Sequence, residues 1–117
     1  MIVLFQGDCA LRDQLCEALH DRGLAVWAVD DNMSARRILI REGPRVRVLI
    51  VDHLHVSARK ARWFIDKAAS YSQSGWLVHL VDDVATFTGL PGIVCPRKEP
   101  WAIVEMAAAL ARSRGAR

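Results

Sequence analysis

The chain has few cysteines, and they form no pairing or metal-binding pattern. Its 117 residues include three cysteines, Cys9, Cys16 and Cys95, and no Cys-x-x-Cys. Three thiols cannot all pair with one another, and structural zinc sites usually draw on closely spaced cysteines and histidines. The sequence therefore argues against both a disulfide framework and a structural zinc site.

Long apolar runs are also absent. No stretch approaches the roughly 20 consecutive apolar residues that cross a bilayer. The opening "MIVLF" is short and lacks the basic lead of a secretory signal. The glycine-bearing stretches "GDCALRD" and "GLPGI" match neither GxGxxG nor the P-loop. We therefore expect a cytoplasmic protein with no membrane contact and no bound dinucleotide.

The chain carries a moderate excess of positive charge. The net charge is +3, and the excess arginines lie mostly between residues 36 and 47 and in the tail "ARSRGAR". No aromatic residues are interleaved with these basic stretches, as they are in many single-strand nucleic-acid binders. We expect solvated arginines and no nucleic-acid partner, and DNA contact through the arginine-rich second helix is the weaker alternative.

The chain does have apolar segments, and their spacing alternates between that of strands and that of helices. Hydrophobic residues make up 52% of the sequence, enough for one folded domain over residues 1–117. Buried strands are predicted for 1–6, 24–29, 45–51, 76–81 and 92–95. Helices are predicted for 10–23, 33–43, 57–72 and 100–113, with Gly23 and Gly43 as terminators of the first two. Core or half-buried positions are expected for most of the four tryptophans, Trp27, Trp63, Trp76 and Trp101, although Trp101 could lie on an exposed face beside the fifth strand.

This alternation predicts an α/β fold. Strands joined by helices pair in parallel through right-handed crossovers, and near-continuous apolar strands indicate a sheet covered on both faces. Five such strands favour a doubly wound, flavodoxin-like sheet in the order 2-1-3-4-5. The interval "DDVATFTGLPG" between strands four and five is too short for a helix with two loops. We therefore expect the fourth helix to be short or missing.

Acidic residues follow two strands that should be neighbours. Asp8 comes after the first strand, and Asp52 ends the apolar run "VLIV" of the third. Ligands of open α/β sheets collect at the carboxyl ends of the strands. Asp8 and Asp52 could therefore share one pocket there.

The order of elements and the local patterns resemble a known family nearly along the whole chain. "VLIVD", "CALRDQLCEALHDRGLAVWAVDDNMSARRIL" and "GIVCP" are similar to segments of the receiver domain (CheY-like) of bacterial two-component response regulators. The resemblance places the phosphoaccepting aspartate on Asp52. It also implies Mg²⁺ as the cofactor of ordinary receivers, and a histidine kinase or another signalling protein as partner.

The chain departs from this family at the positions that carry the chemistry. The family's acidic pair falls on Gln6 and Gly7 and its lysine on Cys95. Its Thr or Ser falls on Val81, or on Asp82 if the alignment shifts by one residue. Cys95 supplies no positive charge, and Val81 has no hydroxyl. We therefore expect a cleft without its usual cationic and hydroxyl groups, although a loop could bring back the later Lys98.

These departures favour a pseudo-receiver, a receiver scaffold that acts through protein contact and is not an enzyme. It would bind no cofactor, or Mg²⁺ weakly at Asp8 and Asp52. An ordinary receiver phosphorylated on Asp52 is the alternative. If Asp52 is not a phosphoacceptor, it would cap the strand end and accept hydrogen bonds from loop amides.

Two other groupings suggest different chemistry. His53 and His55 form a His-x-His pair that His79 and Asp82 could complete as a transition-metal site, although loop histidines without metal are the simpler expectation. A small phosphotransfer enzyme using Cys9 is an alternative of another class, because a helix start lowers a thiol's pKa. The phosphatase pattern, however, needs an arginine where Leu15 stands.

A contact surface is the last expectation. Phe87, Leu90 and Trp101 flank the shortened fourth crossover, a region through which receivers often bind partners or a second copy. We expect either a contact patch there, for a partner or a homodimer, or residues that fill the gap left by the missing helix.

Overall fold

The computed structural model describes residues 1–5, 9–54, 56–71, 75–87 and 90–113. Five strands alternate with four helices in this part of the chain. The strands are β1 (Ile2–Phe5), β2 (Val26–Val29), β3 (Val48–Asp52), β4 (Trp76–Val81) and β5 (Ile93–Pro96). The helices are α1 (Cys9–Asp21), α2 (Asn32–Glu42), α3 (Ala58–Tyr71) and α4 (Pro100–Arg112).

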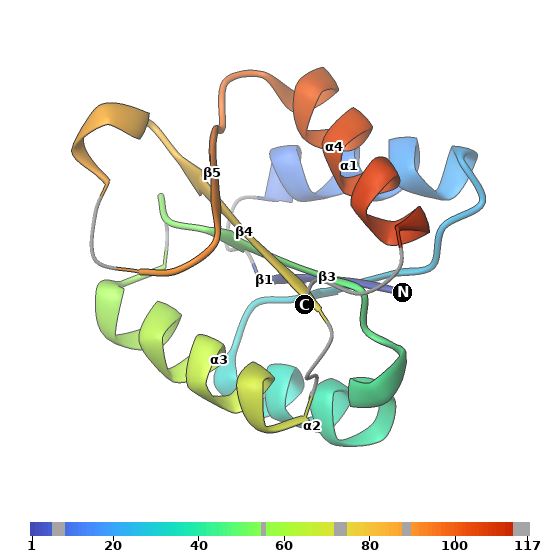
Figure 1. Ribbon diagram of the computed structural model, residues 1–117, viewed down its shortest axis with the longest axis vertical. Helices are drawn as coiled ribbons and strands as arrows, with labels where there is room; N and C mark the ends of the chain where they lie inside the picture. Colours follow the sequence, from blue (N-terminus) through green and yellow to red (C-terminus); the bar gives the residue numbers. More distant parts are fainter. Residues whose placement is uncertain (6–8, 55, 72–74, 88–89, 114–117) are drawn as a thin grey trace.

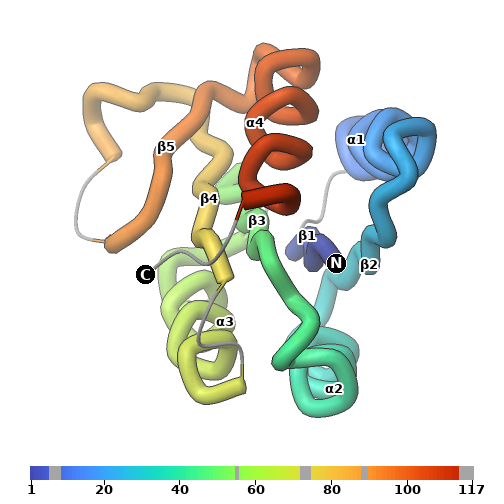
Figure 2. The backbone as a smooth tube through the Cα atoms, turned by 45° about the vertical axis from the view of Figure 1, so that its right-hand side comes forward, coloured from blue at the N-terminus to red at the C-terminus, as the bar shows by residue number. Residues whose placement is uncertain are grey.

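The five strands form one parallel sheet in the order β2-β1-β3-β4-β5, which confirms the predicted flavodoxin-like topology. Figure 1 shows α1 and α4 on one face of this sheet and α2 and α3 on the other. The same three-layer arrangement is visible along the backbone in Figure 2. The carboxyl ends of the strands therefore meet at one edge, where the candidate site lies.

The core has two parts, one on each face of the sheet. Alternate residues of a strand point to opposite faces, so each central strand contributes to both parts. On the α2–α3 face, the rings of Phe5 and Phe64 stack with centroids 4.7 Å apart. On the α1–α4 face, apolar strand residues pack against leucines of α1 and small or branched residues of α4, namely Leu11, Leu15, Leu19, Ile103, Val104 and Ala107.

Local signals set the helix ends. Asp31 precedes α2 and its carboxylate accepts a hydrogen bond of 2.7 Å from the Ser34 backbone N–H, which satisfies a donor that the helix itself leaves unpaired. Gly23 follows α1 with φ of +78°, the left-handed conformation that glycine adopts without a Cβ clash. Pro100 stands in the first turn of α4, where its missing N–H costs nothing.

The fourth crossover has no α-helix among its described residues, as predicted. It contains the short 3₁₀ helix Val84–Thr86 instead. An apolar groove of about 340 Å³ therefore lies between α3 and the strands β4 and β5, with Ile65, Leu77 and Ile93 among its walls. In the part of the chain that is described, no helix combines the length and apolar character needed to cross a membrane.

Candidate functional site

Asp52 lies at the carboxyl end of β3, with a fully buried side chain. All five residues of β3 are buried, so the strand carries the carboxylate into the interior with it. The backbone N–H of Leu54 donates to Asp52 Oδ1 at 3.0 Å. Such a hydrogen bond stabilises the charged form, but one amide does not compensate for the loss of water around a buried carboxylate.

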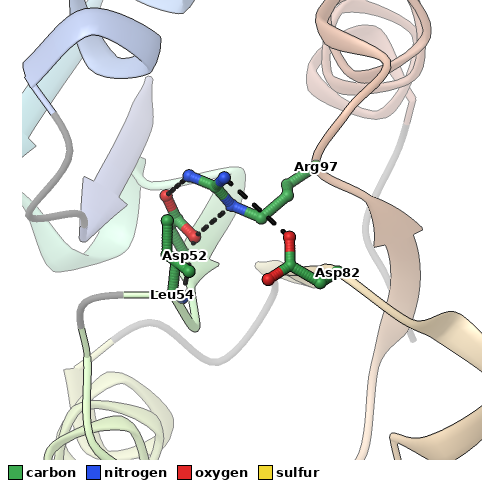
Figure 3. A network of polar contacts seen from close by, with 4 residues as sticks. All are labelled: Asp52, Leu54, Asp82 and Arg97. Carbon is green, nitrogen blue, oxygen red and sulfur yellow. Dashed lines mark hydrogen bonds and ion pairs between the residues drawn. The ribbon is translucent and has the colours of Figure 1, made fainter.

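The compensating charge comes from Arg97. Its Nε donates to Asp52 Oδ1 at 3.2 Å, and its Nη2 donates to Oδ2 at 3.0 Å, so both carboxylate oxygens are engaged (Figure 3). The third nitrogen, Nη1, lies 3.9 Å from Oδ1 of Asp82. The side chains of Arg97 and Asp52 are 13% and 0% exposed, so water screens this pair little. A planar guanidinium matches the spacing of two carboxylate oxygens, which makes this the strong form of an ion pair.

The backbone places Arg97 where it can reach Asp52. The Arg97 N–H donates to the Val81 carbonyl at 2.9 Å, which continues the β4–β5 ladder one residue beyond β5. Asp52 lies beside Leu80 in the β3–β4 register. Arg97 therefore starts beside the end of β4, and its long side chain crosses that strand's end to the end of β3.

The expectation of a cleft without a cationic group is therefore wrong. The cation is Arg97, two residues after the family's lysine position, and not Lys98, whose side chain is exposed. Cys95 itself packs on the α4 side, with Sγ 3.4 Å from Sδ of Met106, and burial raises the pKa of its thiol. The arginine after "GIVCP" was the only signal in the sequence, and the resemblance gave no reason to single it out.

A second polar pair lies beside this site, with His79 buried and His53 half-buried. His53 Nε2 and His79 Nδ1 are 2.8 Å apart, and His79 Nε2 is 2.8 Å from the Pro91 carbonyl oxygen. Because a carbonyl only accepts, His79 carries its proton on Nε2, and its Nδ1 accepts from the Nε2–H of His53. The ring of Phe87 lies 4.8 Å from that of His53 and 5.0 Å from that of His79.

This pair is held in its neutral form. Burial lowers the pKa of His53 to about 4, with a further contribution from His79, against the opposing effect of Asp52. Burial also lowers the pKa of His79, although its bond to the Pro91 carbonyl opposes the change. The two imidazoles therefore act as a hydrogen-bonded bridge from the loop after β3, through β4, to the segment before β5.

The geometry gives the transition-metal alternative little support. The two facing nitrogens of His53 and His79 bond to each other instead of converging on a common point. Across the described ranges, no three His, Cys, Asp or Glu side chains are grouped as a metal ion would need. His55 lies outside the described residues.

The other residues predicted for the site are Asp8, Val81 and Cys9. Asp8, with Gln6 and Gly7, lies outside the described residues, so its pairing with Asp52 stays a prediction. Val81 is buried at the end of β4, and Cys9 is exposed at the start of α1.

The three residues of the predicted contact patch have different surroundings. Phe87 packs on the two histidines, as a residue that fills the gap would, and Leu90 is half-buried. Trp101 is 70% exposed on α4, with the Arg22 guanidinium carbon 5.4 Å from its ring centroid. A patch that joins all three remains a prediction.

Comparison with known proteins supports the fold. No protein-family model matches the chain, and no curated protein matches it in sequence. A crystal structure of a two-component transcriptional regulator AraC from Clostridium phytofermentans ISDg is similar, with a TM-score of 0.72. The match covers 95% of this chain and 90% of that chain at 13% sequence identity. The chain therefore has a receiver-like fold, as its sequence resemblance predicted, and an identity this low shows the fold alone.

Proposed function

We propose that the chain is a receiver-like signalling domain that works by protein contact, without phosphoryl transfer to Asp52. The observation that carries this proposal is the buried ion pair between Asp52 and Arg97. In an ordinary receiver the aspartate needs a free oxygen that attacks the phosphoryl donor. Here Arg97 donates to both oxygens, and Leu54 donates to one of them as well.

The described residues fit a magnesium site poorly. Mg²⁺ takes oxygen ligands in near-octahedral geometry, usually with one or two carboxylates. Of the described carboxylates at this edge, Asp52 is paired at both oxygens, and Asp82 has one oxygen 3.9 Å from the same guanidinium. A metal ion at Asp52 would have to displace Arg97 and leave it without this partner. We therefore propose that the domain uses no cofactor, or at most weakly held Mg²⁺.

When both oxygens of Asp52 are paired in this way, the edge of the sheet at the carboxyl ends of the strands keeps one fixed arrangement. Its output would then be a constant surface, recognised by a histidine kinase, another signalling protein or a second copy. It would act in the cytoplasm as a binding partner and not as an enzyme.

The experiment is incubation with acetyl phosphate and Mg²⁺, read by intact mass, together with beryllofluoride and Mg²⁺, read by amide NMR. The control is Asp52→Asn, which has no acceptor oxygen that can attack. We expect no adduct and no beryllofluoride-dependent shifts in either protein. A stoichiometric, magnesium-dependent adduct that Asp52→Asn abolishes would restore the ordinary response regulator.

A further inference from the structure

An apolar strand, β2, forms the end of the sheet opposite β5, and no strand among the described residues pairs with its outer edge. β2 pairs with β1 and stands last in the strand order. The Ile2 N–H donates to the Ala25 carbonyl at 2.8 Å. Because successive residues of a strand direct their backbone groups to opposite edges, Val26 and Ala28 direct theirs away from β1. The sequence "VWAV" has neither the lysine nor the proline that commonly protects such an edge from pairing.

A groove runs between this strand and α2. Its volume is about 320 Å³, and its walls are Trp27, Ala28, Val29, Ser34, Arg37, Ile38 and Arg41. Trp27, expected in the core or half-buried, is 42% exposed, and the Arg41 guanidinium carbon lies 5.1 Å from its ring centroid. The groove thus combines an aromatic wall with two guanidinium groups beside an open strand edge.

Among the described residues, no ion pair balances the positive charge of this groove. None of the ion pairs between described residues involves Arg37 or Arg41. Asp31 interacts electrostatically with Arg37. The pKa of Asp31 is lowered mainly by the hydrogen bonds it accepts from Ser34 and only slightly by Arg37. The Asp31 carboxylate caps α2 by accepting a hydrogen bond from the Ser34 backbone, so it does not form an ion pair with Arg37. Positive charge therefore remains available to a partner.

We propose that the β2 edge and this groove bind an extended acidic segment of another protein. The segment would add to β2 as a sixth strand, through the outward backbone groups of Val26 and Ala28, and place carboxylates on Arg37 and Arg41. The strand edge favours a polypeptide over a nucleic acid, since phosphates and bases do not continue a β-ladder. Arginine pairs with carboxylates through two parallel bonds, which fixes the charge of the partner.

The geometry also sets the pattern of the segment. Alternate side chains of an added strand point to the α2 side, so acidic residues at every second position would face the two arginines. β1 separates this surface from the Asp52–Arg97 pair, so it can bind whether or not Asp52 accepts a phosphoryl group. Binding at the β2 edge is therefore independent of the proposed function, and either can fail without the other.

The probe is an acetylated, amidated peptide of four Glu-Thr repeats, titrated into the whole chain and followed by amide NMR. We expect saturable shifts confined to β2 and α2, with slowed exchange of the Val26 and Ala28 amides. Arg37→Glu should weaken binding by roughly tenfold or more, the usual effect of losing a charged hydrogen bond. Arg36→Glu is the matched control, because Arg36 carries the same charge on the same helix but does not line the groove.

Ala28→Pro tests the edge itself, because it removes an outward N–H that β1 does not use. It should weaken peptide binding, while the amide NMR spectrum of the free variant remains that of the folded protein. Equal losses from Arg36→Glu and Arg37→Glu would overturn the proposal, as would equal binding of a Lys-Thr peptide. It would also be overturned by a dT8 oligonucleotide that competes for the groove, or by self-association without peptide that Ala28→Pro abolishes.

Discussion

Arg97 and Asp52 stand 45 residues apart in the chain, and two hydrogen bonds of 3.2 and 3.0 Å join their side chains. The arginine follows β5 and the aspartate ends β3, so the pair spans the end of β4 between them. It fixes the edge of the sheet at which ligands of this fold collect.

Replacing Arg97 with alanine should destabilise the fold strongly. The Asp52 carboxylate would remain buried without its partner, which costs about 3–5 kcal/mol in the free energy of unfolding. The matched control is Arg45→Ala, because Arg45 is 78% exposed and pairs with Glu42 at the surface. Such a pair contributes about 1 kcal/mol or less. Urea unfolding at pH 7 measures both, and equal losses would show that the buried pair is no stronger than the surface one.

The two histidines predict a loss of stability in mild acid. The folded state keeps His53 neutral down to a pKa of about 4, against an ordinary value of 6.5. Between these values the unfolded chain binds more protons, so the free energy of unfolding should fall as the pH decreases from about 6.5 to 4. His53→Gln should flatten this dependence in part, since His79 remains. Urea unfolding across that range tests it, with His20→Gln as the control for removing a surface imidazole, and an unchanged slope in His53→Gln would contradict the assignment.

Gly92 is expected to tolerate substitution less well than Gly23. Both have positive φ, +122° and +78°, so alanine is strained at either position. A Cβ on Gly92 would also lie 2.7 Å from the Leu77 carbonyl oxygen and 3.2 Å from His79 Nε2, whereas nothing lies within 4 Å of one on Gly23. Gly92→Ala should therefore cost roughly 1–3 kcal/mol beyond Gly23→Ala. Thermal unfolding of the two variants compares them, and equal costs would mean that the segment before β5 shifts freely.

The sequence predicted the fold because the signals for it are local. Apolar runs, glycine terminators and the short interval 82–92 depend on neighbouring residues, and together they indicate the alternation of strands and helices and the shortened fourth crossover. The strand order was then expected from the doubly wound folds in which this alternation occurs. The position of Asp52 was predictable for the same reason, because it ends a continuous apolar run.

The partners within the site were not predictable, because they depend on contacts between distant segments. Arg97 reaches Asp52 only because the β4–β5 ladder continues past Pro96. The partner of His79 is the Pro91 carbonyl, a backbone group that carries no sequence signal. Trp27 is exposed because its strand is last in the sheet and its groove on the α2 side stays open, which the apolar pattern "VWAV" does not reveal.

The most direct test of the Asp52–Arg97 pairing is a double-mutant cycle with Asp52→Asn, Arg97→Gln and the double variant, unfolded in urea at pH 7. Both changes remove charge. Asparagine keeps the size of the aspartate side chain, and glutamine keeps an amide donor on a shorter side chain than arginine. The structure predicts a coupling of roughly 1.5–3 kcal/mol between the two positions. A coupling within about 0.3 kcal/mol of zero would mean that Arg97 does not neutralise Asp52, and would remove the basis for a receiver-like domain that works without phosphorylation.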